Sequence, residues 1–383
     1  MHTSDWHAGR LWKNVDRLTE LEAVLDDLGS FIERERIDLM LVSGDLFDNV
    51  APNAAAERLV FRFLKRVGSA GAHSVVIAGN HDSAARLDAW GTLAELVQVH
   101  VVGRPRRAED GGVIELVTRG GERVVVAAVP FAPVRTLISA LELAEDETLA
   151  MQRYADGMSR IIASLAERFR DDAVNLLTAH THLESAVFSG SERRVHLGNE
   201  WAAMPQSLPA RAHYVALGHI HRPQAVAAAP CPTRYAGSPL QLDFGESGEA
   251  KSFVVVEAEP GLPAQVDQVA YRGGQELRVV EASLADLERD AEQLRASGWL
   301  KVIVPLAAPE PELNARVRRL LPNAVSVDVR LPEVVPAAPA ASTRSMTPHE
   351  LYRAYYAGAY GKEPDPALLA AFDRLLDDDD AEA

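Results

Sequence analysis

The residues with the clearest capacity for chemistry are acids, histidines and one asparagine that each follow a short apolar run. Asp45 illustrates the pattern, because it follows the run over residues 37–42, which is typical of a buried strand, and the turn residue Gly44. A carboxylate at the end of such a strand projects into the crevice where open α/β sheets bind ligands. An Asp that caps the next helix would explain this single position equally well.

Four further apolar runs end in residues of the same types. They lead to Asp5 with His7, to Asn80 with His81, to His180, and to His219 with His221. These side chains offer oxygen and imidazole ligands without thiolate, a set that suits Mn, Fe, Mg or Zn rather than copper(I) or an iron–sulfur cluster. Ligands that share one carboxylate would hold two metals roughly 3.5–4 Å apart, which clamps a phosphoryl group for in-line displacement. The pattern therefore predicts a two-metal site.

The order of the motifs adds a family resemblance. Asp-x-His, Gly-Asp-x-x-Asp, Gly-Asn-His-Asp, a distal His and Gly-His-x-His together resemble the calcineurin-type metallophosphoesterases. The longer strings over residues 3–9, 78–83, 216–222 and 235–239 resemble one branch of that superfamily, the SbcD type, whose members are the nuclease subunits of bacterial SbcC–SbcD complexes. The resemblance extends in pieces from the first residue to the C-terminal region.

This resemblance implies a role for each candidate. One metal site would consist of Asp5, His7, His221 and a bridging Asp45, and the other of Asn80, His180, His219 and the same Asp45. The two divalent ions are expected to be Mn²⁺, with Mg²⁺ as the alternative. His180 and His182 compete for one position, and His180 is favoured because it directly follows the apolar run. His81 would protonate the leaving oxygen as a general acid. Asp48 would orient His81, contact the substrate, or do both.

The periodicity around these motifs predicts the elements that position them. Residues 15–36 and 54–67 have helical spacing and alternate with strands, which is typical of a doubly wound α/β layer. Residues 111–130 predict a hairpin, and hence a second sheet. The expected fold is therefore α/β: a two-sheet sandwich flanked by helices, with a small α/β capping domain and a C-terminal helical hairpin.

Five segments are expected along the chain. They are a metallophosphoesterase nuclease domain over residues 1–262, a capping domain over 270–332, a linker over 333–347, a helix–loop–helix over 348–376 and an acidic tail over 377–383. Within the capping domain we expect strands alternating with helices over 283–297 and 310–320. The Pro- and Ala-rich linker is typical of a semi-stiff tether. The first strand is short, which predicts either a clipped strand or a start further upstream.

Composition sets limits on location and on DNA binding. The single cysteine, Cys231, fits a reducing compartment, and the sequence has neither a signal peptide nor an apolar run long enough for a bilayer, so no membrane association and a cytoplasmic, nucleoid-associated location are expected. The net charge of −16 argues against DNA wrapping by a generally basic surface. DNA would instead be held by the metals and a few local cations. The Trp12 ring would stack on a nucleic-acid strand, with Arg10 and Lys13 neutralising its phosphates, or it would simply cover its own loop.

The resemblance implies hydrolysis of DNA phosphodiester bonds, as a double-strand exonuclease and a single-strand or hairpin endonuclease, in DNA repair, recombination and replication. Two alternatives are a small-molecule phosphodiesterase or phosphatase on the same scaffold, and a metal-binding scaffold that mainly recruits an ATPase. The extra domain and the C-terminal hairpin argue against the first alternative. The intact His81 argues against the second.

Two protein partners are expected. The apolar stripes in residues 348–376 predict docking on an SbcC-type coiled-coil ATPase. The resemblance also implies a homodimer, through residues 48–67 or 90–96. The apolar side chains that would form either its seam or the core are Phe61, Phe63, Trp90 and Leu93.

Overall fold

The computed structural model describes residues 1–137, 147–184, 186–189, 191–192, 202–307, 310–331 and 346–381. The chain divides into two compact units, one of residues 1–303 with 314–328 and the other of residues 304–313 with 329–383. The predicted linker lies outside the described residues, except for its last two positions. Among the described helices, every one is too short or too polar to cross a bilayer.

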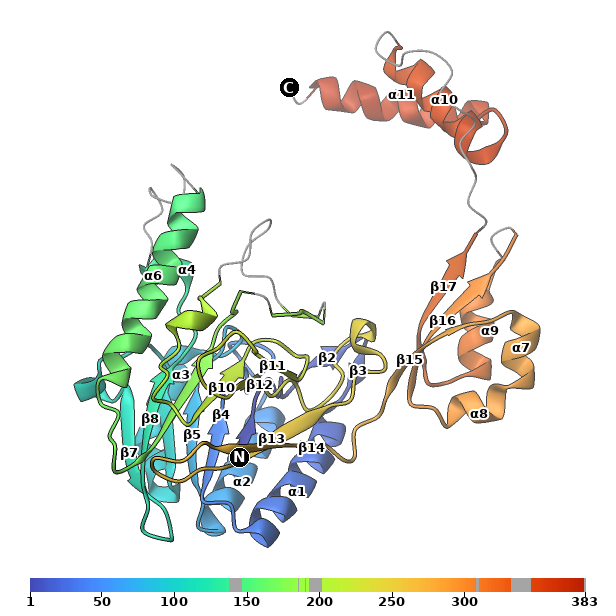
Figure 1. Cartoon of the computed structure of the whole chain (residues 1–383). Helices are drawn as coiled ribbons and strands as arrows, with labels where there is room; N and C mark the ends of the chain where they lie inside the picture. Colours follow the sequence, from blue (N-terminus) through green and yellow to red (C-terminus); the bar gives the residue numbers. More distant parts are fainter. Residues whose placement is uncertain are drawn as a thin grey trace. The chain divides into compact units, whose positions relative to one another are not determined.

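Two six-stranded sheets form the body of the first unit (Figure 1). The strand order of the first sheet is β14 (Gln265–Ala270), β13 (Ser252–Glu257), β1 (His2–Thr3), β4 (Leu39–Val42), β5 (His73–Ile77) and β6 (Val99–Val102). Strands β1, β4, β5 and β6 are parallel, and β13 pairs antiparallel with both β1 and β14. The predicted domain boundary at residue 262 is therefore too early, because β14 pairs with β13 and belongs to this sheet.

The second sheet carries the hairpin that the glycine pattern predicts. Its strand order is β11 (Gln224–Ala225), β12 (Thr233–Tyr235), β10 (Tyr214–Gly218), β9 (Val174–His180), β8 (Arg123–Val129) and β7 (Val113–Val117). Strands β8, β9, β10 and β12 are parallel, while β7 pairs antiparallel with β8. This antiparallel pair confirms the hairpin expected over residues 111–130.

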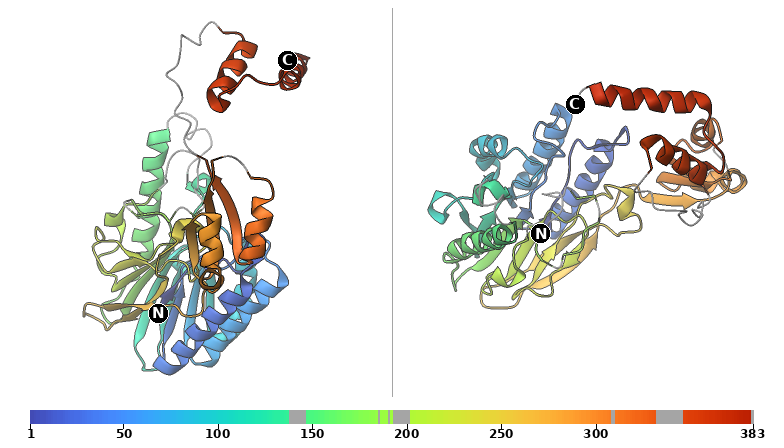
Figure 2. Two further views of the ribbon diagram at one scale, coloured as in Figure 1. Left: turned by 90° about the vertical axis from the view of Figure 1, so that its right-hand side faces the viewer. Right: turned by 90° about the horizontal axis from the view of Figure 1, so that it is seen from above.

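Helices cover the outer faces of the two sheets. They are α1 (Leu18–Glu35), α2 (Ala54–Ser69), α3 (Ala84–Ala94) and α6 (Glu147–Ala166). The described part of the first unit also contains α4 (Val134–Leu137) and the short 3₁₀ helices η1 (Glu95–Val97), η2 (Ala108–Asp110), η3 (Pro205–Ser207) and η4 (Phe244–Glu246). Helices α1 and α2 lie side by side against the first sheet, and α6 lies well apart from them against the second (Figure 1; Figure 2). A two-strand hairpin, β2 (Leu11–Trp12) and β3 (Val15–Asp16), precedes α1, so the predicted helix begins three residues later than expected.

The apolar core explains why these helices form. Every third or fourth side chain of α1, including Leu21, Leu25 and Leu28, is buried against the first sheet. Between the sheets, Leu41 of β4 packs in the same cluster as Leu176 of β9. The predicted sandwich of two sheets flanked by helices is therefore confirmed.

A third, three-stranded sheet forms the capping region. Its elements are β15 (Leu277–Glu281), α7 (Leu284–Arg289), α8 (Ala291–Arg295), β16 (Trp299–Pro305), α9 (Leu313–Leu320) and β17 (Ala324–Arg330), with strand order β15-β16-β17. The single helix predicted over residues 283–297 is wrong. The backbone of Asp290 leaves the helical region, with φ −98° and ψ 9°, where Arg289 holds its carboxylate at 2.8 Å. Aspartate competes poorly for a helix interior, so the helix breaks there.

The second unit contains the predicted pair of C-terminal helices, α10 (Pro348–Tyr360) and α11 (Pro366–Ala381). A capping box between Thr347 and Glu350 begins α10, and Gly361 ends it with a left-handed backbone. The acidic tail expected over residues 377–383 is helical as far as the structure describes it, through Ala381. Extending an existing helix requires no new nucleus, so an acidic run can continue it.

Candidate metal centre

The proposed ligands lie where the carboxyl ends of strands from both sheets meet. Asp5 and His7 follow β1, Asp45 follows β4, Asn80 follows β5, His180 ends β9, and His219 and His221 follow β10. The sheets are joined at this edge by the hydroxyls of Ser43 and Thr178, 2.9 Å apart. His180 Nδ1 also donates to the Ser43 carbonyl oxygen at 2.8 Å. The fold thus assembles one site from both sheets.

Four of these residues have a left-handed backbone conformation, which residues other than glycine rarely adopt. Their φ angles are 54° for Asp5, 46° for His7, 52° for Asp45 and 97° for His219. Residues in this region cost about 1–3 kcal/mol each and cluster at functional sites, where the surrounding structure holds them. Here the Asp5 N–H donates to the Gly44 carbonyl oxygen, and the His7 N–H donates to that of Asp45, each at 3.0 Å. The strain re-aims the side chains towards a common centre.

The first cluster consists of Asp5, His7 and His221, whose potential ligand atoms lie within 4.8 Å of one another. The Nε2 atoms of His7 and His221 are 3.2 Å apart, although the residues are 214 positions apart in the chain. Two buried imidazole nitrogens that point at each other are well placed to share one cation.

The second cluster surrounds Asn80. Its Oδ1 lies 3.0 Å from His180 Nε2 and 2.9 Å from His219 Nδ1. Asp45 lies between the two clusters, since its Oδ2 is 3.5 Å from His180 Nε2 and 3.7 Å from His7 Nε2. A carboxylate in that position can face a cation on either side.

His182 is the other candidate for the position of His180. Its ring packs against Phe188, with ring centroids 4.6 Å apart. His180, by contrast, faces both Asn80 and Asp45. This geometry favours His180 as the ligand.

His81 and Asp48, the two residues expected to act without being ligands, lie beside the first cluster. His81 Nδ1 donates to the backbone carbonyl oxygen of Asp48 at 2.7 Å, and the rings of His81 and His7 meet edge to face with centroids 4.7 Å apart. The Asp48 carboxylate faces His7 Nδ1 at 3.3 Å and Arg10 at 3.2 Å. Asp48 therefore contacts His81 through its main chain, while its side chain lies between His7 and Arg10.

The electrostatics of the cluster test whether a cation fits. Burial raises the pKa of Asp5 to about 7, and burial together with the charges of Asp82 and Asp5 raises the pKa of Asp45 well above its ordinary value. Burial lowers the pKa of His180 to about 3, and it lowers the pKa of His7 well below its ordinary value. Neutral imidazoles next to carboxylates that have lost their water suit a divalent cation, because its charge compensates the buried acids.

Asp82 has a structural role that the motif did not reveal. It is buried, and its carboxylate accepts from the backbone N–H groups of Leu46, Phe47 and Gly79 at 3.2, 3.0 and 2.9 Å. It thereby ties the loop that carries Asp45 to the loop that carries the second cluster. Asp82 is the last residue of the Gly-Asn-His-Asp motif, and this position was the one sign in the sequence that it belongs to the site.

The expectation that Trp12 faces DNA or covers its loop is wrong. Its side chain is only 4% exposed and packs against Phe244, Leu277 and Val325. Its Nε1 donates to Asp243 at 3.2 Å. Trp12 therefore belongs to the core between the sandwich and the capping strands, whereas its neighbours Arg10 and Lys13 remain the local cations.

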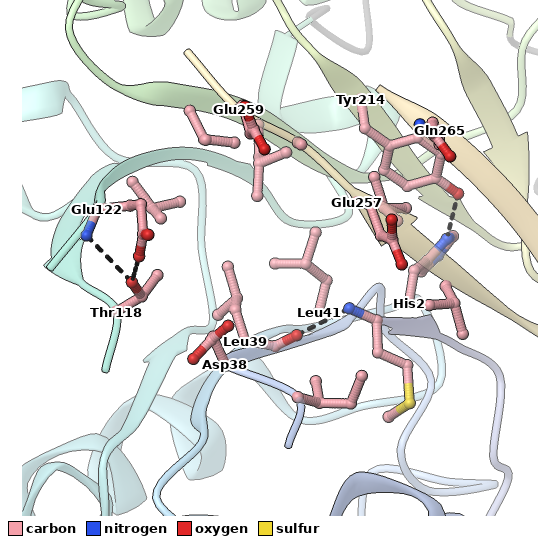
Figure 3. A pocket seen from close by; sticks show the side chains of 18 of the residues that line it. His2, Asp38, Leu39, Leu41, Thr118, Glu122, Tyr214, Glu257, Glu259 and Gln265 are labelled. Carbon is pink, nitrogen blue, oxygen red and sulfur yellow. Dashed lines mark hydrogen bonds between the residues drawn. The ribbon is translucent and has the colours of Figure 1, made fainter. Parts of the chain in front are cut away.

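A cavity of about 590 Å³ lies elsewhere in the first unit and includes none of the proposed ligands (Figure 3). It is lined by Met1, whose ammonium donates to the Leu39 carbonyl oxygen at 2.8 Å, and by His2, which contacts the Tyr214 hydroxyl at 2.9 Å. Glu122 and Glu257 are among several acids in its lining. Such a lining repels phosphate groups.

Comparisons with known proteins agree with this geometry. Residues 1–223, which contain every proposed ligand, match the family model described as calcineurin-like phosphoesterase. The SbcD subunit of nuclease SbcCD from Bacillus subtilis is 37% identical over 278 residues, which are 72% of this chain and 70% of that protein. The chain belongs to the SbcD family of calcineurin-like phosphoesterases.

Further relatives of the SbcD family extend the match. The SbcD subunits of nuclease SbcCD from Escherichia coli and Rhodobacter capsulatus are 30% and 31% identical over 301 and 386 residues. The alignments cover 77% and 93% of this chain, and 74% and 94% of those proteins. A second family model, described as type 5 capsule protein repressor C-terminal domain, matches residues 274–360, which span the capping elements and α10. The SbcD resemblance of the motifs is thus confirmed.

Proposed function

We propose that this protein is a metal-dependent DNA nuclease, a double-strand exonuclease and single-strand or hairpin endonuclease that works with an SbcC-type ATPase in DNA repair and recombination. The observation that carries the proposal is the position of the buried Asp45 carboxylate between His7 of one cluster and His180 of the other. The names of the SbcD relatives supply the substrate class. With DNA as substrate, we expect the protein to work at the nucleoid in the cytoplasm.

Two divalent ions, Mn²⁺ with Mg²⁺ as the alternative, are the proposed cofactors. Their proposed ligands are Asp5, His7 and His221 for one ion and Asn80, His180 and His219 for the other, with Asp45 shared. When bound, such a pair stabilises charge on the transferring phosphoryl group and supplies a nucleophile at neutral pH.

His81 is the proposed general acid. Because its Nδ1–H donates to the Asp48 carbonyl oxygen, Nε2 is the atom that carries the transferable proton. Its ring meets that of His7 edge to face, which places it beside the proposed ligands. Asp48 positions both rings, His81 through its carbonyl and His7 through its carboxylate.

Local cations support a nucleic-acid substrate despite the acidic chain. Arg10 and Lys13 follow the first ligands directly, and the half-exposed Arg222 follows His221. Phosphate contacts from such residues position a strand without reading its sequence. The names of the SbcD relatives do not favour the small-molecule phosphodiesterase, although the same metals would serve it.

The test is digestion of linear duplex DNA with Mn²⁺, with and without an SbcC-type ATPase. His81→Ala should lower turnover by about 10²–10⁴-fold while both metals stay bound. His349→Ala, on helix α10, is the matched control and should cleave like the wild type. Hydrolysis of bis(p-nitrophenyl) phosphate without any DNA cleavage would instead favour the small-molecule candidate. Loss of a metal from His81→Ala would contradict its assignment as a non-ligand.

The helix–loop–helix over residues 348–376 is the proposed docking element for the ATPase. Tyr352 of α10 stacks on Phe372 of α11, with centroids 4.2 Å apart, while Leu351 and Tyr355 stay exposed. A short helix pair with exposed apolar groups suits a partner groove. Leu351→Glu with Tyr355→Glu should abolish complex formation but leave DNA hydrolysis by the isolated protein intact. Lys362→Ala is the control, and unchanged ATPase affinity of the double variant would refute docking here.

A homodimer through the α2–α3 face is also proposed. Phe61 meets Trp90 there edge to face, with ring centroids 4.5 Å apart, and the neighbouring Leu93 and Leu96 are 72% and 81% exposed. Phe63 is buried in the core and cannot contribute to such a seam. Leu93→Arg with Leu96→Arg should yield a monomeric mass in solution, whereas an exposed apolar residue on another face, changed in Val117→Arg, should not. A monomeric wild type at micromolar concentration would exclude the dimer.

A further inference from the structure

The ring of His221 has a partly buried polar partner, Ser191, on the side opposite its proposed metal-facing nitrogen. The Ser191 hydroxyl lies 2.6 Å from His221 Nδ1 and also contacts Glu246 Oε1. The Glu246 side chain is 0% exposed, and its Oε1 lies 3.4 Å from the same ring nitrogen. A carboxylate completely removed from water is costly unless it is paired and hydrogen-bonded, so the partners of Glu246 show what holds it there.

The Glu246 carboxylate is held from its other side as well. Its Oε2 pairs with Lys251 Nζ at 2.6 Å and accepts from the Leu242 N–H at 3.0 Å. Lys251 Nζ also donates to the backbone carbonyl oxygen of His221 at 2.8 Å. One buried ion pair therefore fixes both the ring and the main chain of His221.

The donors and acceptors of this chain of contacts determine one tautomer. An ionised Glu246 only accepts, so the Ser191 hydroxyl must donate to it and must accept from His221 Nδ1–H. A neutral ring protonated at Nδ1 carries its lone pair at Nε2. That atom is the one 3.2 Å from His7 Nε2, in the first cluster.

We propose that Glu246 is a positioning residue that acts through Ser191 to hold His221 with Nε2 available to a metal ion. The proposal rests on the metal site described above and adds a residue that lies outside every motif of the chain. The comparison with His180 supports it. His180 obtains the same tautomer from a backbone carbonyl, that of Ser43, whereas His221 depends on side chains that a substitution can remove.

The test combines histidine tautomers with metal affinity. In ¹⁵N-histidine-labelled, metal-free full-length protein, wild-type His221 should carry its proton at Nδ1. Glu246→Gln should lose this preference, because an amide can donate to Ser191 as well as accept from it. Titration with Mn²⁺ should then show binding at the His221 site weakened about 10–100-fold, the usual effect of losing the outer partner of a ligating histidine, with the Asn80 site unchanged. Glu249→Gln, beside the same Lys251, is the matched control and should bind like the wild type.

A second variant separates positioning from folding. Glu246→Gln leaves Lys251 without its closest anion, whereas Glu246→Gln combined with Lys251→Met removes the whole ion pair, a change that buried pairs often tolerate. Both variants should show the same tautomer change and the same selective loss. An unchanged tautomer with wild-type affinity in the folded double variant would overturn the proposal, and so would equal weakening of both sites. Neither readout depends on DNA cleavage, so a failed nuclease assay would leave this test intact.

Discussion

Gly79 offers the sharpest test of how tightly the residues of the two ligand clusters pack around Asp45. A Cβ atom on Gly79 would lie 2.0 Å from Asp45 Oδ1 and 2.4 Å from Asp45 N. The backbone of Gly79 is outside the left-handed region, so alanine is excluded by space alone. To restore an ordinary 3.4 Å contact, Gly79→Ala must therefore push the Asp45 backbone N away by about 1 Å and its Oδ1 away by about 1.4 Å.

The cost follows from what that movement breaks. Asp45 Oδ1 accepts from the His81 N–H at 2.8 Å, and a hydrogen bond to a charged group contributes about 1.5–3 kcal/mol. Overpacking adds about 1–3 kcal/mol. We expect the free energy of unfolding to fall by about 3–5 kcal/mol. Because Oδ2 of the same carboxylate faces both His7 and His180, the affinities of both metals should fall together.

Denaturant unfolding of the metal-free protein and titration with Mn²⁺ measure the two effects. Gly91→Ala is the matched control, since its new Cβ would meet Val101 at an ordinary 3.8 Å inside α3. That change should be neutral or stabilise by up to about 1 kcal/mol. Wild-type stability and metal affinity in Gly79→Ala would refute this account of the site. So would loss of only one metal.

Three further predictions test other parts of the first unit. Asp45→Asn should weaken both metals together in an Mn²⁺ titration, and selective loss of one metal would exclude a bridging role. Burial lowers the pKa of His2 to about 3, so below the ordinary pKa of about 6.5 the folded state binds fewer protons than the unfolded state. Between pH 7.5 and 5.5 the free energy of unfolding of the wild type should therefore fall by about 1.4 kcal/mol more than that of His2→Gln, and parallel pH profiles of the two proteins would contradict this. Trp299 Nε1 donates to Glu20 at 2.8 Å, so Trp299→Phe should lower the free energy of unfolding by about 1–3 kcal/mol and speed proteolysis of the capping strands. An unchanged rate of proteolysis would show that this hydrogen bond does not anchor those strands.

The candidate ligands could be predicted because their positions follow from local patterns. A short apolar run followed by Asp, Asn or His identifies a strand end, and parallel strands bring such ends to one edge of a sheet. Asp45 and Asn80 follow neighbouring strands of the first sheet, and His219 follows a strand of the second. The sandwich was predictable for the same reason, since helical and strand periodicities alternate along the first half of the chain.

Boundaries and partners were less accessible because they depend on packing. Residues 265–270 form a mostly exposed edge strand, so their side chains show no apolar alternation that would mark them. Trp12 is an aromatic residue beside two cations, which is equally typical of a nucleic-acid contact and of a surface aromatic that covers its loop. Trp12 is a core residue because Phe244 and Leu277, more than 230 positions later in the chain, pack against it.

The outer partners of the ligands mark the physical limit of reading this chain by pattern. Glu246 lies in a single 3₁₀ turn with no periodicity, 25 positions after the histidine it supports, and its contact with that ring passes through Ser191. A ligating histidine needs an outer acceptor for its other ring nitrogen. The pattern does not say which group that is, because a backbone carbonyl serves as well as a carboxylate. His180 uses the former and His221 the latter. The difference has a consequence for function: substitutions outside the motifs can change the affinity of the His221 site, whereas the Nδ1 partner of His180 persists whatever side chain residue 43 carries.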